Sequence, residues 1–183
     1  MAFNDPLVIP KALELLACYE QELDKMDDPP VHRGVRPGTT VDFLLSLSDD
    51  ECCAGLAWVR PATFYPSSAT FPAQDETPNK QGTQGWAVTL EMGIAVCAPT
   101  PDERSIPTAQ EWLAVTQKVY DAGAAMRRAI CCYIEADRPN RLQRVLPGLW
   151  QPVAVEGGCV GGILPVTVRG PECDCADAGP ISS

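Results

Sequence analysis

The sequence has few basic residues, a single histidine and no long apolar run. Lys and Arg number 14 against 24 Asp and Glu, so the formal net charge is −10. This balance argues against binding to a nucleic-acid backbone, which requires clustered cations. No apolar run approaches the roughly 18 residues of a membrane span, and residues 1–5 lack the basic and apolar parts of a signal peptide. We expect an acidic soluble protein.

The sequence also lacks the motifs of common enzyme classes. It has no His-Glu-x-x-His motif, no dinucleotide fingerprint and no paired carboxylates, and no Gly-Lys-Ser/Thr of a phosphate loop follows the glycine-rich residues 157–162. The enzymatic alternative that remains is a cysteine nucleophile, Cys131, Cys132 or Cys159, with His32 as its base. We expect a protein that is not an enzyme and has no catalytic residue, cofactor or metal.

Cysteine, in contrast, is abundant. The nine cysteines include no Cys-x-x-Cys pair. Together with the lack of an export signal, this spacing favours thiols packed as small buried hydrophobes in a reducing compartment. The sharper alternative is a zinc site built from distant ligands such as Cys53, Cys97, Cys132 and Cys159.

Two long periodic segments organise the middle of the chain. Residues 86–97 alternate between large apolar and smaller or polar residues, which is typical of a strand with one buried face. Thr108 and Glu111 then match a capping box, which predicts the start of a helix of about 27 residues that ends at Pro139. Its predicted core stripe consists of Trp112, Val115, Val119, Ala122, Met126, Ile130 and Tyr133. Small residues at 123–125 leave room for a second body at its middle.

The flanking segments predict one more helix and several shorter strands. A helix is expected over about residues 10–27, followed by a loop over residues 31–40. Strands are expected at residues 41–47, 52–65, 150–155 and 163–168, and the first two should form an antiparallel pair. Pro61 removes a backbone donor, so the second strand should be bulged or lie at an edge there. Residues 66–85 form a loop too long for a simple connection, which is typical of a functional or disordered segment.

These elements predict one α+β domain over residues 1–169. Its sheet should be antiparallel or mixed, with about four strands and two helices packed on one face. The long loop lies within this domain. Residues 170–183 lack any periodic pattern and should form an extended C-terminal tail.

Five blocks of sequence carry a resemblance to known proteins. They are CCAGLAWVR at 52–60, FYPS at 64–67, LEMGI at 90–94, AAMRRAICC at 124–132 and GGCVGG at 157–162. Together they resemble a family of neck proteins from long-tailed phages of actinobacteria, similar to tail terminators. The resemblance implies a homohexameric ring in the virion neck that caps the tail tube and joins it to the head connector.

The same resemblance implies the partners and the location. The partners would be further copies of the chain, the tail tube protein and the head-tail connector proteins, with assembly in the host cytoplasm. A head-side adaptor or stopper ring is the alternative role within the same particle.

The negative charge suits a ring through which DNA passes. Six copies carry a formal charge of −60 (6 × −10), and a lumen of that sign repels phosphates, so the genome slides without specific binding. The candidate lumen or interface acids lie in predicted turns and loops. They are Asp49, Asp50, Glu51, Asp75, Glu76, Asp102 and Glu103.

Overall fold

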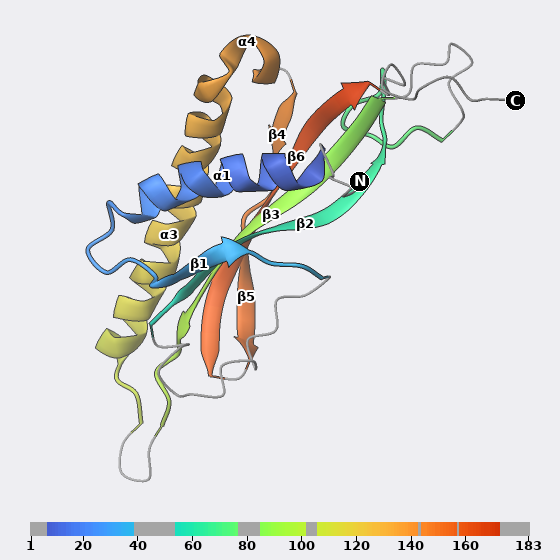
Figure 1. Ribbon diagram of the computed structural model, residues 1–183. Coiled ribbons are helices and arrows are strands. Elements are labelled where there is room, and N and C mark those ends of the chain that lie inside the picture. The colour runs from blue at the N-terminus through green and yellow to red at the C-terminus, as the bar shows by residue number, and fades with distance from the viewer. Residues whose placement is uncertain are drawn as a thin grey trace, which may run out of the picture.

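A mixed β-sheet with its two long helices on one face is the framework of the protein (Figure 1). The computed structural model describes residues 7–38, 54–76, 85–101, 106–142, 144–156 and 158–172. Within these ranges the helices are α1 (Val8–Leu23), α3 (Ala109–Ala136) and α4 (Arg138–Arg141). The strands are β1 (His32–Val35), β2 (Leu56–Pro66), β3 (Gly85–Cys97), β4 (Val145–Pro147), β5 (Gln151–Glu156) and β6 (Cys159–Glu172). The α+β prediction is confirmed, with a six-stranded sheet.

The sheet runs in the order β1-β2-β3-β6-β4, and β5 also pairs with β6. β1 and β2 are parallel, whereas the other pairs are antiparallel. β6 has 14 residues, so its first half pairs with β5 and its second half with β4. Gly158, with a φ of 77°, lies in the tight turn where Glu156 faces Cys159. The predicted strand at 163–168 is therefore the middle of a longer one.

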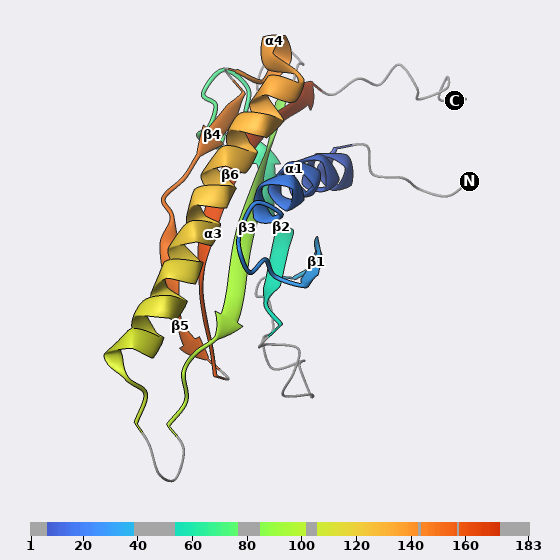
Figure 2. The ribbon, with the colours of Figure 1, turned by 90° about the vertical axis from the view of Figure 1, so that its left-hand side faces the viewer.

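One side of β3 carries the core. Val88, Leu90, Met92, Ile94 and Val96 alternate along it and are buried in one cluster with residues of α1 and α3, as the period of the sequence predicted. Figures 1 and 2 show both long helices against the strands. α1 packs over β1 and β2, and α3 packs over β3 and β6.

α3 begins as predicted, but its first turns lie outside the core. The Thr108 hydroxyl accepts a hydrogen bond from the Glu111 amide, and the Glu111 carboxylate accepts one from the Thr108 amide. Val115 is the first residue of α3 that packs against the core cluster, and Trp112 is 41% exposed. The placement of Trp112 in the core was wrong, because the N-terminal turns of α3 diverge from the strands (Figure 2).

Four side-chain contacts fasten α1 and the residues after it to α3 and α4. They are the ion pairs Glu14–Arg141, Glu22–Arg128 and Asp28–Lys118 and the disulfide Cys18–Cys132. We call this set the helix seam. The Arg141 guanidinium also donates a hydrogen bond of 2.9 Å to the Tyr133 carbonyl, so it satisfies an acceptor in the last turns of α3.

The disulfides correct the prediction of packed thiols. Cys18 and Cys132 are bonded although 114 residues separate them, and Cys97 and Cys159 are also disulfide-bonded. Among the described cysteines, Cys131 is the free thiol. The spacing of cysteines along the chain could not reveal this pairing, because the fold brings residues from two distant helices to a Cα–Cα distance of 5.8 Å.

Several predicted boundaries also change. Residues 32–35, predicted as loop, form β1, whose four residues are too short to show a period. α3 ends at Ala136, and Pro139 lies in α4 rather than at the end of α3. The predicted strand at 41–47 lies outside the described residues, as does the tail after residue 172. The bulge at Pro61 is confirmed by a register shift between Pro61 and Thr63.

No helix in the described ranges is both long and apolar enough to cross a bilayer.

Candidate functional site

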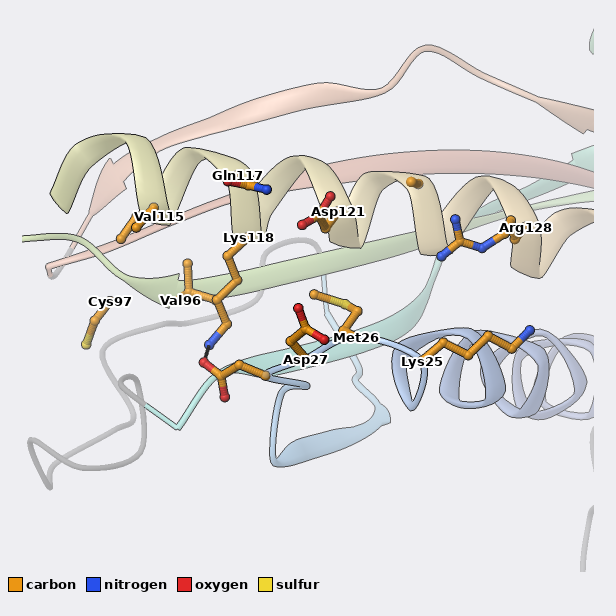
Figure 3. A pocket seen from close by; sticks show the side chains of 13 residues that line it. Lys25, Met26, Asp27, Val96, Cys97, Val115, Gln117, Lys118, Asp121 and Arg128 are labelled. Carbon is orange, nitrogen blue, oxygen red and sulfur yellow. Dashed lines mark hydrogen bonds and ion pairs between the residues drawn. The ribbon is translucent and has the colours of Figure 1, made fainter. Parts of the chain in front are cut away.

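A cleft of about 700 Å³ opens between the end of α1, the end of β3 and the first half of α3 (Figure 3). Apolar side chains line part of it, among them Met26, Val96 and Val115. The charged residues of its lining are Lys25, Asp27, Asp28, Lys118, Asp121 and Arg128. Lys118 forms an ion pair with Asp28, with 2.5 Å between Nζ and Oδ2, and Figure 3 shows the Lys118 side chain extending from α3 across the cleft.

The cations of the cleft are paired within the protein. Lys25 Nζ and Arg128 Nε lie 2.5 and 2.7 Å from the carboxylate of Glu22. The hydrogen bonds from Lys25 and then from Arg128 hold the pKa of Glu22 below its usual range. Because Lys118 is paired with Asp28, each of these three cations already has a carboxylate partner, so the cleft has no surplus of positive charge with which to select an anion.

The chemistry that the described residues offer is limited. In these ranges no group of three or more His, Cys, Asp or Glu side chains could hold a metal ion. Of the candidate nucleophiles, Cys132 and Cys159 are disulfide-bonded, whereas Cys131 is exposed. His32, the proposed base, lies in β1. The zinc set is contradicted at Cys132, whose sulfur is bonded to Cys18, and at Cys97 and Cys159, which also form disulfides.

Of the predicted acidic residues, the structure describes Asp75 and Glu76. Asp75 and Glu76 lie in the loop after β2, where Glu76 is exposed. Asp75 accepts hydrogen bonds from the Ser68 hydroxyl (2.5 Å), the Thr70 hydroxyl (2.6 Å) and the Ser68 amide (2.9 Å), which lower its pKa. Asp75 thus organises the loop. The acids that lie outside the described residues are Asp49, Asp50, Glu51, Asp102 and Glu103.

The first half of the predicted long loop is a compact turn. Ser67 is buried; its amide donates to the Gly85 carbonyl (2.9 Å) and its hydroxyl to the Ala73 carbonyl (2.8 Å). The Asp75 amide donates to the Pro66 carbonyl (2.9 Å), which closes the turn. Residues 66–76 therefore form a defined feature beside the start of β3, and residues 77–84 lie outside the described ranges.

A second apolar surface runs along the side of α3 that faces away from α1. Leu113 is 64% and Tyr120 57% exposed. The Trp150 ring contacts the Tyr120 ring at a tilt, with centroids 4.8 Å apart, and Leu149, the residue before Trp150 in the chain, is 72% exposed. We call Leu113, Tyr120 and Leu149 the α3 flank.

The middle of the α3 flank is narrow and uncharged. An added Cβ on Gly123 would lie 2.9 Å from Trp150 Nε1, so the glycine makes room for the indole. The small residues at 123–125 were predicted to leave room for a second body. At Gly123 that room is filled by Trp150 of the same chain. Thr116 and Gly123 also lie on this side of the helix. The charged residues between Glu111 and Arg127 are Lys118 and Asp121, and both line the cleft instead.

Sequence reasoning assigned no function to the α3 flank. Leu113 and Tyr120 lie seven residues apart, on a line separate from the core stripe. A second apolar line on a helix that already has a core face is a signal of an interface. The contribution of Leu149 had no such signal, because it depends on how Trp150 folds back onto α3.

Comparison with other proteins gives no further assignment, since no family model and no curated protein matches this chain.

Proposed function

We propose that this protein is a ring-forming subunit of the neck of a long-tailed phage, where it acts as the tail terminator. The observation that carries the proposal is the α3 flank. Three large apolar side chains lie exposed on a chain whose net charge is −10, and an exposed apolar surface of this kind marks a contact with another protein. The resemblance to tail terminators supplies the identity of the assembly.

Two further features support this proposal. The disulfides suit a particle that persists outside a cell, because disulfides are stable in oxidising surroundings. The compact turn at residues 66–76 is a defined feature at one end of the sheet, where a docking partner in the tail or head has an ordered surface to contact.

The proposal is tested by assembly. Negatively stained images and native mass spectrometry of the purified protein should show closed rings, with a mass that is a multiple of 19.7 kDa. Added to polymerising tail tube protein, gold-labelled rings should sit at one end of each tube and shorten the distribution of tube lengths. A protein that stays monomeric at every concentration would overturn the proposal. Rings that bind the head connector but leave tubes unchanged would instead favour the adaptor or stopper role.

A further inference from the structure

We infer that the cleft between α1 and α3 is a docking site for a basic segment of a partner protein, which places a lysine or arginine side chain between Asp27 and Asp121. The cleft is a different surface from the α3 flank. The inference does not depend on the ring function, because a single copy of the chain contains the whole cleft.

Two carboxylates of the cleft remain after its cations are paired. Each of the three cations in the lining has a carboxylate partner within the protein. Among the residues that the structure describes, Asp27 and Asp121 form no ion pair, and both are exposed. Figure 3 shows them on opposite walls of the cleft, Asp121 on α3 and Asp27 just after α1. The cleft therefore offers two carboxylates to a cation from outside.

Lys118 shows how the cleft holds such a cation. Its side chain extends from α3 across the cleft and is only 21% exposed, although its ammonium group pairs with Asp28. Lysine and arginine bury their methylene stems on apolar surface in this way and keep the charged end at a polar partner. Apolar lining for the stem of a second cation is supplied by Met26, Val96 and Val115.

The chemistry of the cleft fits an organic cation better than a metal ion. A protein site for a metal ion needs several ligating side chains around one point. In the described ranges no group of three or more His, Cys, Asp or Glu side chains has that arrangement. An ammonium or guanidinium group forms a charge-assisted hydrogen bond with a single carboxylate, and its stem uses the apolar lining.

The exposure of the cleft favours a partner protein over a free small molecule as the source of the cation. Small-molecule sites enclose most of their ligand, whereas the side chain of Asp28 on one wall is 79% exposed. A protein segment makes further contacts outside the cleft, so partial enclosure of its cation is sufficient. The net charge of −10 attracts a basic partner and repels a second copy of this chain.

A short synthetic peptide tests the inference on the 183-residue chain. The probe is a fluorescently labelled peptide in which two arginines flank a leucine, and fluorescence anisotropy at low salt measures its binding. Replacing both arginines with citrulline, which keeps the shape and removes the charge, should abolish binding. Replacing the leucine with serine should weaken binding, because the apolar lining then loses its partner.

Two substitutions in the protein test the carboxylates. Asp27→Asn and Asp121→Asn should each weaken binding of the arginine peptide by up to about fivefold, as expected for a partly exposed ion pair, and the double variant should lose more than either. Glu76→Gln is the matched control, because it removes one negative charge at an exposed position outside the cleft. It should bind the peptide as wild type does. Circular dichroism should show the wild-type melting midpoint for all of these variants.

Methyl-labelled methionine gives the position of the bound peptide. Met26 lines the cleft, whereas Met92 and Met126 are buried in the core cluster. In NMR spectra the arginine peptide should shift the Met26 methyl resonance and leave the other two in place.

Four results would overturn the inference. The first is an arginine peptide that does not bind. The second is an equal loss of binding in Glu76→Gln, because the peptide would then respond to net charge rather than to the cleft. The third is a Met26 resonance that does not shift at saturation. The fourth is free argininamide that binds as tightly as the peptide, which would indicate a small-molecule site. All four leave the ring function standing, and a wild-type protein that is always monomeric would leave this docking site standing.

Discussion

At the scale of single residues, two tryptophans rest on glycines. Trp58 lies over Gly93, where an added Cβ would come within 2.1 Å of the indole ring. Trp150 lies between α3 and β6, against Gly123 and Gly162, where added Cβ atoms would come within 2.9 and 2.5 Å. The second contact connects core and surface, because the same indole stacks against Tyr120 of the α3 flank. A side chain at either glycine would therefore displace the ring that supports the flank.

The first prediction separates the core side of α3 from its exposed start. Met126 is buried in the core cluster, so Met126→Ala should lower the free energy of unfolding by about 2 to 5 kcal/mol, through lost burial and a residual cavity. Trp112→Ala, at a position that is 41% exposed and outside the core cluster, should cost less than Met126→Ala. Urea unfolding followed by circular dichroism measures both. A larger loss for Trp112→Ala would contradict the placement of the first turns of α3.

The second prediction uses the lowered pKa of Glu22. In the folded state its carboxylate is stabilised by Lys25 and Arg128, so its contribution is present above the unfolded pKa, about 4.3, and is lost as pH falls through the lower folded value. Glu22→Gln should therefore cost about 1 kcal/mol at neutral pH, since Arg128 is half exposed. The difference from wild type should shrink steadily below about pH 4.

Urea midpoints measured from neutral to acidic pH follow this difference. Glu135→Gln is the matched control, because Glu135 and Arg138 form a loose pair of 3.7 Å on the surface. Its midpoint should equal that of wild type at each pH. A pH-independent loss for Glu22→Gln would show that the packing of the side chain, rather than its charge, stabilises the seam.

At the scale of elements, the helix seam holds α1 against α3 and α4. The disulfide Cys18–Cys132 spans 114 residues of sequence, so it restricts the unfolded chain over most of its length. The double variant Cys18→Ser/Cys132→Ser should lose roughly 2 to 5 kcal/mol of stability under non-reducing conditions, because this restriction is removed. The double variant avoids leaving one unpaired thiol at the seam.

Cys131→Ser is the control for the disulfide, because Cys131 is the neighbouring free and exposed thiol. It should unfold at the wild-type urea concentration. Peptide mapping of the unreduced wild-type protein should recover Cys18 and Cys132 in one linked fragment. Alkylation of both residues in native protein without a reductant would contradict the seam.

The elements differ in how far the sequence could predict them. β3 and α3 were predictable, because an alternation over 13 residues and a capping box before a long apolar stripe are local patterns. β1 and β4 were not, since four and three residues show no period and their pairing depends on distant strands. The compact turn at 66–76 was expected only as a long loop, because its form depends on the contacts of Asp75 with Ser68 and Thr70.

At the scale of the whole molecule, the charge balance could be read from the sequence, whereas the distribution of charge over the surface could not. The acidic residues proposed for a lumen were chosen because they fall in turns, and of the two that the structure describes, Asp75 is used inside its loop. The apolar surfaces were hidden because exposure is a property of the fold. Leu113 and Tyr120 lie off the core stripe of α3, but that the fold leaves both exposed is seen only in the structure.

The last prediction concerns the response of the assembly to salt. If copies meet through apolar surfaces while each carries a net charge of −10, repulsion between copies opposes assembly, and added salt screens it. Raising NaCl from about 0.05 to about 0.5 M shortens the Debye length from more than 10 Å to less than 5 Å, so the assembled fraction at fixed protein concentration should rise.

Light scattering across this salt range measures the assembled fraction. The same titration near pH 4.5, the isoelectric point, is the control, because the net charge there is close to zero and the salt effect should be nearly absent. Dissociation at high salt near neutral pH would point to an interface of ion pairs. The exposed arginines around α4, Arg138 and Arg144, would then replace the α3 flank as the first residues to vary, because each presents a cation that a neighbouring carboxylate can pair with.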